Sequence, residues 1–223
     1  MGATIGALLA NAVGVAISPV PVIAVILMLF SPSAARNASA FLVGWLLALS
    51  AVVGVVAALG GLGGSDGGRV VGDVVKIVVG VLFLLLALRQ WRSRPAPGTE
   101  PEPPAWMASI DSFTAAKAVG FGALFAGANP KNLGLGVAAG TTIAASGLPA
   151  GQQVVVGAVY VVLASLTVVG PVVAYLVARE RVSPALDRAK LWLVANNATV
   201  MVVLFTVLGA KVLGDGLGSL LAR

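Results

Sequence analysis

Long apolar stretches alternate with short polar ones along the chain, and this pattern predicts an all-α polytopic membrane protein. A helix needs about 20 apolar residues to cross the ~30 Å hydrocarbon core of a bilayer. Stretches of roughly this length, separated by turns rich in glycine, proline or charge, cover residues 5–30, 40–59, 70–88, 115–145, 154–177 and 191–213. We expect each of these six stretches to form one transmembrane segment.

Two of the six stretches contain residues that a continuous membrane helix would exclude. Residues 18–21 (S-P-V-P) interrupt the first stretch, and residues 129–132 (N-P-K-N) interrupt the fourth. Proline removes a backbone donor and frees the carbonyl four residues earlier, so the carbonyls of Val15, Ile17 and Ala126 should need other partners. As one helix the fourth stretch would be ~45 Å long, which predicts two half-helices or a re-entrant hairpin.

The two interruptions occupy matching positions in two halves of the chain. Pro19 and Pro130 lie 111 residues apart, and each half holds three predicted spans. An odd number of spans forces the second half to enter the membrane inverted, and paired interruptions in inverted halves are typical of a transporter site at the midplane. We therefore predict a 3+3 inverted repeat of residues 1–91 and 113–223, joined by a cytoplasmic linker at 92–112 that is rich in proline.

Positive charges orient the predicted spans. The turns after the first, third and fifth spans carry most of the basic residues, and cytoplasmic loops of membrane proteins collect Lys and Arg. Both termini should then face the extracytoplasmic side. The residues that set this orientation are Arg36, Arg89, Arg92, Arg94, Arg179, Arg181, Arg188 and Lys190.

Composition narrows the chemistry that the chain can perform. It is 59% hydrophobic and only 10% charged, and it contains neither cysteine nor histidine. Thiol chemistry, zinc sites and Ser-His-Asp triads are therefore excluded. The sequence also offers no pair of carboxylates of the kind that would suggest an enzyme. We expect no cofactor and no metal. The net charge of +6 is explained by cytoplasmic loops rather than by nucleic-acid binding, because no basic stretch is interleaved with aromatic residues.

Lys131 is the most informative single residue. It lies about 15 residues from either end of its apolar stretch, where a lysine costs ~3 kcal/mol on insertion scales. It could face a watery cavity, pair with Asp73 across the bundle, bind an anionic group of a cargo, or simply lie in a polar break near the interface. Because burial disfavours a charged amine, proton coupling through Lys131 is a further expectation.

The remaining polar residues of the spans are weaker indications of a path. They could line the route of a cargo or form hydrogen bonds between helices, and we expect the second role for Asn11, Thr141, Thr142, Asn196 and Asn197. Asp73 and Lys76 are three apart and should share a helix face. The residues that we expect to bind the cargo are Ser18, Pro19, Pro21, Asn129, Pro130, Lys131 and Asn132.

The motifs at the two breaks also resemble a known family. Six spans with a proline pair in the first and Asn-Pro-Lys in the fourth resemble the lysine-exporter (LysE) superfamily. The stretches G-V-A-I-S-P-V-P-V-I-A-V-I-L-M-L-F and A-F-L-V-G-W look more like the actinobacterial GAP family of sulfolipid- and glycopeptidolipid-addressing proteins. The resemblance implies that glycolipids of the cell envelope are moved across the inner membrane. It departs from many exporters of the superfamily at Val20, where they have glycine.

The sequence thus predicts an inner-membrane transporter that exports an anionic envelope lipid or glycolipid. Asn129, Pro130 and Lys131 match the second-half motif of the superfamily, and Pro19 and Pro21 match the first. An exporter of amino acids or ions, and an accessory scaffold for envelope lipid export, are the alternatives. A homodimer, and contacts with proteins of envelope lipid biosynthesis or export, are further expectations.

Overall fold

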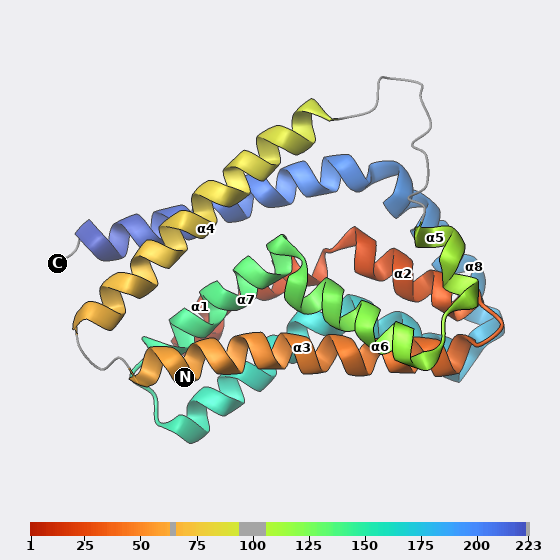
Figure 1. The fold of residues 1–223 in the computed structure, drawn as a ribbon, viewed down its shortest axis with the longest axis horizontal. Coiled ribbons are helices and arrows are strands. Elements are labelled where there is room, and N and C mark those ends of the chain that lie inside the picture. Colours follow the sequence, from red (N-terminus) through yellow and green to blue (C-terminus); the bar gives the residue numbers. More distant parts are fainter. Residues whose placement is uncertain (63–65, 94–105, 222–223) are drawn as a thin grey trace.

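The computed structural model describes residues 1–62, 66–93 and 106–221, and all elements found in these ranges are helices (Figure 1). The predicted all-α class is therefore confirmed. The elements are α1 (Gly2–Ala16), α2 (Pro19–Phe30), α3 (Ala34–Leu62), α4 (Asp66–Arg92), α5 (Trp106–Ser109), the 3₁₀ turn η1 (Ile110–Ser112), α6 (Ala115–Ala123), the π-helical turn η2 (Leu124–Ala128), α7 (Pro130–Ala144) and α8 (Ala150–Leu221).

By length and composition, three helices of the described chain can cross a membrane. They are α3, α4 and α8, and α1 with α2 forms a fourth candidate whose halves are bent by 53°. The chain is therefore a membrane protein with three to four candidate apolar spans. α8 is broken at Ala178, whose φ of −143° and ψ of 48° are not helical. Its 72 residues therefore form two helical arms, and the second arm runs back in roughly the opposite direction to the first (Figure 1).

The structure corrects several predicted boundaries. The expected polar turn at 31–39 shrinks to three residues, because α3 already begins at Ala34. The charged loop expected at 179–190 is helical and belongs to the second arm of α8. Residues with high helix propensity, such as Ala, Leu, Glu and Arg, dominate that segment, and the Lys190–Asp187 ion pair (2.6 Å) lies along it. The charged residues of this segment therefore end the apolar stretch in the sequence, but the helix continues through them.

Only part of the predicted linker can be compared with the structure. Residues 94–105 lie outside the described residues. Within 106–112 the chain forms α5 and η1, and the side chain of Ile110 is buried. Phe113 O, directly after η1, accepts a hydrogen bond from Asn37 Nδ2 (2.9 Å). The last residues of the expected linker are thus packed against α2, and the residue that follows them is hydrogen-bonded to the start of α3.

The fourth apolar stretch runs as two half-helices beside α3. Gly44 of α3 lies against Val119 of α6, and further along, Gly136 and Gly140 of α7 lie against Val52 and Val56. Residue numbers rise together in the two partners, so α6 and α7 continue in one direction along the whole length of α3 (Figure 1). Of the two predicted alternatives, the half-helices are adopted rather than the hairpin.

α4 pairs with the second arm of α8 in an antiparallel arrangement (Figure 1). Glycines let the two backbones approach: a Cβ on Gly80 would meet Leu213 N at 2.6 Å, and one on Gly216 would meet Asp73 O at 3.0 Å. Small residues are common where membrane helices pack closely. The first arm of α8 contacts α1 and α3: Thr167 Oγ1 of this arm donates to Ala16 O, and Trp45 Nε1 of α3 donates to Ser165 Oγ (3.0 Å).

Candidate functional site

The first break lies between α1 and α2. α1 ends at Ala16, Ile17 follows as its C-cap, and Ser18 N donates to Ala16 O (2.8 Å). Pro19 is the first residue of α2, a position where the missing N–H has no intrahelical partner in any case. The proline pair therefore starts a new helix instead of kinking a continuous one, and Ser18 is buried at the junction.

The second break, between η2 and α7, has the same order of residue types. Asn129 N donates to Leu124 O (3.0 Å), five residues back, which closes the π-helical turn. The Asn129 side chain then caps α7 by accepting from Lys131 N (3.0 Å), and Pro130 is the first helical residue. A polar N-cap residue followed by proline thus begins the second half-helix at both breaks.

Lys131 joins the two breaks. Its side chain is 0% exposed, and Nζ donates to the carbonyl of Gly14 (2.6 Å), in the last turn of α1. Gly14 is tightly covered, because a Cβ there would press against Leu135 of α7 and Leu208 of α8. The second interruption therefore contacts the last turn of α1, just before the first interruption, and two leucines cover this contact.

The carbonyls that gain new donors are not those expected from proline positions. At the first break, Lys131 Nζ donates to Gly14 O and Thr167 Oγ1 donates to Ala16 O. At the second break, Asn132 Nδ2 donates to Phe125 O (2.8 Å). The expected carbonyls were those of Val15, Ile17 and Ala126. The difference arises because each helix ends before its proline, so its last turn supplies the unpaired carbonyls.

Substitution of Thr167 tests how much the stability of the first break depends on a side-chain hydrogen-bond donor. Thr167 Oγ1, on the first arm of α8, donates to Ala16 O. Thr167→Val keeps the side-chain shape but leaves that buried carbonyl with one donor fewer, so we expect a loss of about 1–2 kcal/mol of stability. Thr167→Ser should retain most of it.

The measurement is thermal unfolding of the purified protein in detergent. The matched control is Thr206→Val, because Thr206 Oγ1 bonds to Val202 O within its own helix. If both valine variants melt alike, the Thr167 bond contributes nothing specific to the break.

Asn132 leaves an unused acceptor beside Lys131. Its side chain is fully buried, and Oδ1 has no hydrogen-bond partner among the described residues. A buried acceptor without a partner costs about 1–3 kcal/mol. Asn132 Oδ1 and Lys131 Nζ therefore offer a hydrogen-bond acceptor and a donor in neighbouring residues at the start of α7.

Asp73 has a different partner from Lys131 and lies at a different level of the bundle. Asp73 Oδ1 accepts from Lys76 Nζ (3.2 Å), which confirms the expected pairing of these two residues along α4. Gly72 lies beside Thr141, which is ten residues from Lys131, or ~15 Å along a helix. A lysine side chain does not bridge that distance, so the Lys131–Asp73 pair is not formed in this conformation.

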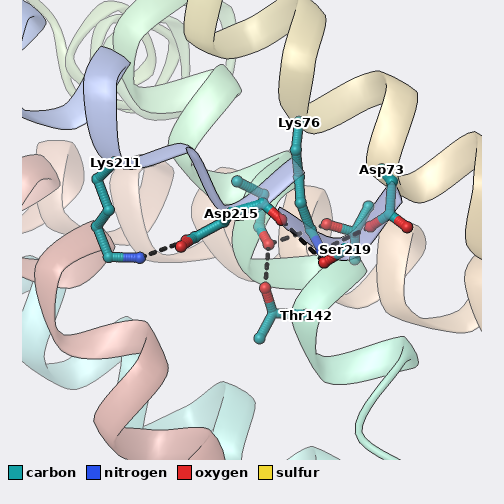
Figure 2. Close-up of polar contacts among 8 residues, drawn as sticks. Asp73, Lys76, Thr142, Lys211, Asp215 and Ser219 are labelled. Carbon is teal, nitrogen blue, oxygen red and sulfur yellow. Dashed lines mark hydrogen bonds and ion pairs between the residues drawn. The ribbon is translucent and has the colours of Figure 1, made fainter. Parts of the chain in front are cut away.

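A polar cavity of about 420 Å³, here called the vestibule, opens beside this ion pair. Figure 2 shows the two ion pairs of this region, Lys76–Asp73 on α4 and Lys211–Asp215 on α8, the latter 2.6 Å long. The other side chains that line the vestibule include those of Asn11, Ala138, Thr142 and Ser219. The charged residues that line it, Lys76, Lys211 and Asp215, each belong to one of these two ion pairs, so the vestibule is polar without a strong net charge.

Asn11 links the vestibule to the break. It is one turn before Gly14 on α1, its side chain is only 4% exposed, and its Oδ1 has no partner in the described part of the chain. The expectation that the polar residues of the spans bond between helices is wrong for Thr141, Thr142 and Asn196, which bond to carbonyls of their own helices. Asn11 and Thr142 instead line the vestibule; a lining role was the alternative that the sequence left open, and only packing places the two residues at one cavity.

The described residues offer no obvious metal site. No group of three or more His, Cys, Asp or Glu residues is placed to hold an ion in that part of the chain. The site therefore consists of one buried lysine amine, amide and hydroxyl groups, and the ends of half-helices. Such groups can bind an anion or a hydroxylated headgroup through hydrogen bonds.

Comparison with known proteins places the chain in one family. A family model described as Sap, sulfolipid-1-addressing protein, matches residues 8–218. The chain belongs to this family. The match covers both breaks, Lys131 and most of the residues that line the vestibule, and it confirms the resemblance to the GAP family. No curated protein and no solved structure matches the chain significantly.

Proposed function

We propose that the protein is an inner-membrane transporter that exports an anionic envelope lipid or glycolipid, whose headgroup passes between the two breaks. The buried amine of Lys131 is the observation that carries this proposal. In the described part of the chain, Lys131 Nζ donates its hydrogen bond to the carbonyl of Gly14 rather than to a carboxylate. A charge at such depth is expensive and usually functional, and an anionic headgroup would supply the missing countercharge.

We further propose that the membrane arrangement is six spans in a 3+3 inverted repeat. Three features support it. Both breaks have a polar cap followed by proline. α6 and α7 pack on α3, and the end of α1 is bonded to the first arm of α8. α4 pairs with the second arm. The beginning of α1 and the end of α8 lie toward the same end of the molecule (Figure 1). In this arrangement that end is extracytoplasmic.

Access to Lys131 would require a movement of α8. Leu208, on the second arm of α8, covers Gly14, and that arm is held closely to α4 by glycine contacts. We propose that α4 and this arm move together as one unit, as in transporters that rock one bundle against another. The conformation described is then the occluded one, and release of the cargo would use the vestibule.

Reconstituted proteoliposomes test this function directly. The probes are a fluorescent sulfated glycolipid, its unsulfated analogue and radiolabelled lysine, each followed with and without an imposed pH gradient. We expect the sulfated lipid to cross at least ~10-fold faster than in empty liposomes, the neutral analogue to cross more slowly, and the pH gradient to change the rate. Accumulation of lysine without lipid movement would indicate a small-solute exporter. Movement of none of the probes would favour the accessory scaffold.

A further inference from the structure

A second polar cavity lies toward the other end of the bundle from the vestibule. This inner cleft, of about 570 Å³, opens between the α2–α3 turn and the kink of α8. Tyr175, one of its lining residues, is eight positions after Thr167, so ~12 Å of helix separates the cleft from the first break. The side chains that matter for its chemistry are those of Phe30, Ser31, Ser33, Arg36, Tyr175 and Arg179.

The inner cleft is positively charged. Arg36 and Arg179 are the charged residues among those that line it, and no carboxylate is among them. Arg36 donates to Ser33 Oγ (3.0 Å) and to Asn37 Oδ1 (3.5 Å), both neutral groups. The guanidinium carbon of Arg179 lies 5.2 Å from the centre of the Tyr175 ring. Both guanidinium groups are thus positioned without neutralisation by these contacts.

The start of α3 adds to this field. Ala34 and Ala35, the first residues of this 29-residue helix, line the same cleft. The N-terminus of a helix carries unpaired N–H groups and a partial positive charge, which favour an anion. Two arginines and a helix N-terminus therefore converge on one cavity.

Tyr175 provides an independent indication of a ligand. Its side chain is only 5% exposed although it lines the cleft, and its hydroxyl has no hydrogen-bond partner among the described residues. A buried hydroxyl without a partner is costly, and it can donate to an anion. The apolar surroundings favour an amphiphile over a free ion, because Val177, two residues further along α8, is 81% exposed and Phe30 is also exposed.

We propose that the inner cleft binds the anionic headgroup of a membrane lipid, as a loading site distinct from Lys131. Arg36, Arg179 and the N-terminus of α3 hold the anion, Tyr175 donates a hydrogen bond, and the acyl chains stay beside the exposed apolar residues of α8. This role as a loading site rests on the proposed export function. The binding itself can be tested without transport.

Native mass spectrometry of the full chain in detergent, titrated with dioleoyl phosphatidic acid, measures this binding. We expect phosphatidic acid to bind at least ~10-fold more tightly than phosphatidylcholine, and inorganic phosphate at millimolar concentration not to displace it. Arg36→Gln combined with Arg179→Gln should weaken binding about 10- to 100-fold, the usual effect of losing hydrogen bonds to a charged group. Tyr175→Phe should weaken it about 3- to 10-fold with the net charge unchanged.

The matched control removes the same charge elsewhere. Arg89→Gln combined with Arg92→Gln, at the end of α4, should change the affinity less than twofold. An equal loss in this control, displacement by inorganic phosphate, or wild-type affinity in Tyr175→Phe would overturn the proposal. If the Arg36 and Arg179 variant does not fold, Tyr175→Phe decides the question. Lys131→Met should retain binding at the cleft, so transport by that variant would contradict the export mechanism and leave the cleft result standing.

Discussion

Replacing Lys131 with methionine is expected to reduce lipid export by about 10- to 100-fold or more while the protein stays folded. Methionine preserves much of the length and volume of the side chain, so no large cavity forms. A charge-assisted hydrogen bond contributes about 1.5–3 kcal/mol, which corresponds to that change in rate if it is made to the moving headgroup. Export per folded molecule, measured in proteoliposomes with the sulfated lipid, provides the test.

Stability separates this role from a purely structural one. Lys131 also holds Gly14 O in the first break (2.6 Å), and Lys131→Met leaves this carbonyl without that donor. If Lys131 is purely structural, the Lys131→Met variant should be less stable but keep its export rate per folded molecule. If Lys131 binds the cargo, the variant should lose export. The matched control is Lys117→Met, which makes the same change at an exposed position of α6. Wild-type export by Lys131→Met would exclude the headgroup role.

Gly44→Ala is expected to cause the largest loss of stability of the single substitutions considered. A Cβ at Gly44 would lie on the carbonyl oxygen of Val119, and one at Gly122 would lie on the carbonyl of Phe41. These are backbone atoms, so the clash is relieved only if α3 and α6 move apart. Overpacking in cores costs about 1–3 kcal/mol and occasionally more, and we expect this variant at or above the upper value.

The same substitution elsewhere on α3 supplies the control. Gly54 has open space where a Cβ would be placed, so Gly54→Ala should be neutral or stabilising by about 0.5–1 kcal/mol, because alanine is the better helix former. Thermal unfolding of both variants in detergent makes the comparison. Equal melting temperatures for Gly44→Ala and the wild type would mean that α3 and α6 are less closely packed than described.

The two breaks show how far sequence reasoning reaches in this chain. Proline, asparagine and lysine inside an apolar stretch are local signals, and they correctly located the interruptions at residues 18–21 and 129–132. The partners of the freed carbonyls depended instead on where each helix ended. That end was set by competing hydrogen bonds, such as the one from Asn129 N to Leu124 O, which residue order alone does not distinguish.

The end of the charged segment at 179–190 illustrates the same limit. Its charges ended the hydropathy pattern, and a loop was the natural expectation. Helix propensity and the ion pair between Asp187 and Lys190 kept it helical, while the turn between the two arms of α8 was made at Ala178. A hydropathy pattern indicates which residues lie in lipid, but it does not indicate where the backbone bends.

By itself the sequence determined the all-helical membrane class, the family and the two interruptions, and it predicted a functional role for Lys131. These follow from composition and local chemistry, because lipid excludes charge and proline cannot continue a helix. The tertiary structure alone decided that Lys131 bonds to Gly14, that α6 and α7 run in one direction along α3, and that Asn11 and Tyr175 line cavities. Those facts depend on contacts between residues far apart in the chain, and in a sequence so rich in similar apolar residues many alternative pairings share the same pattern.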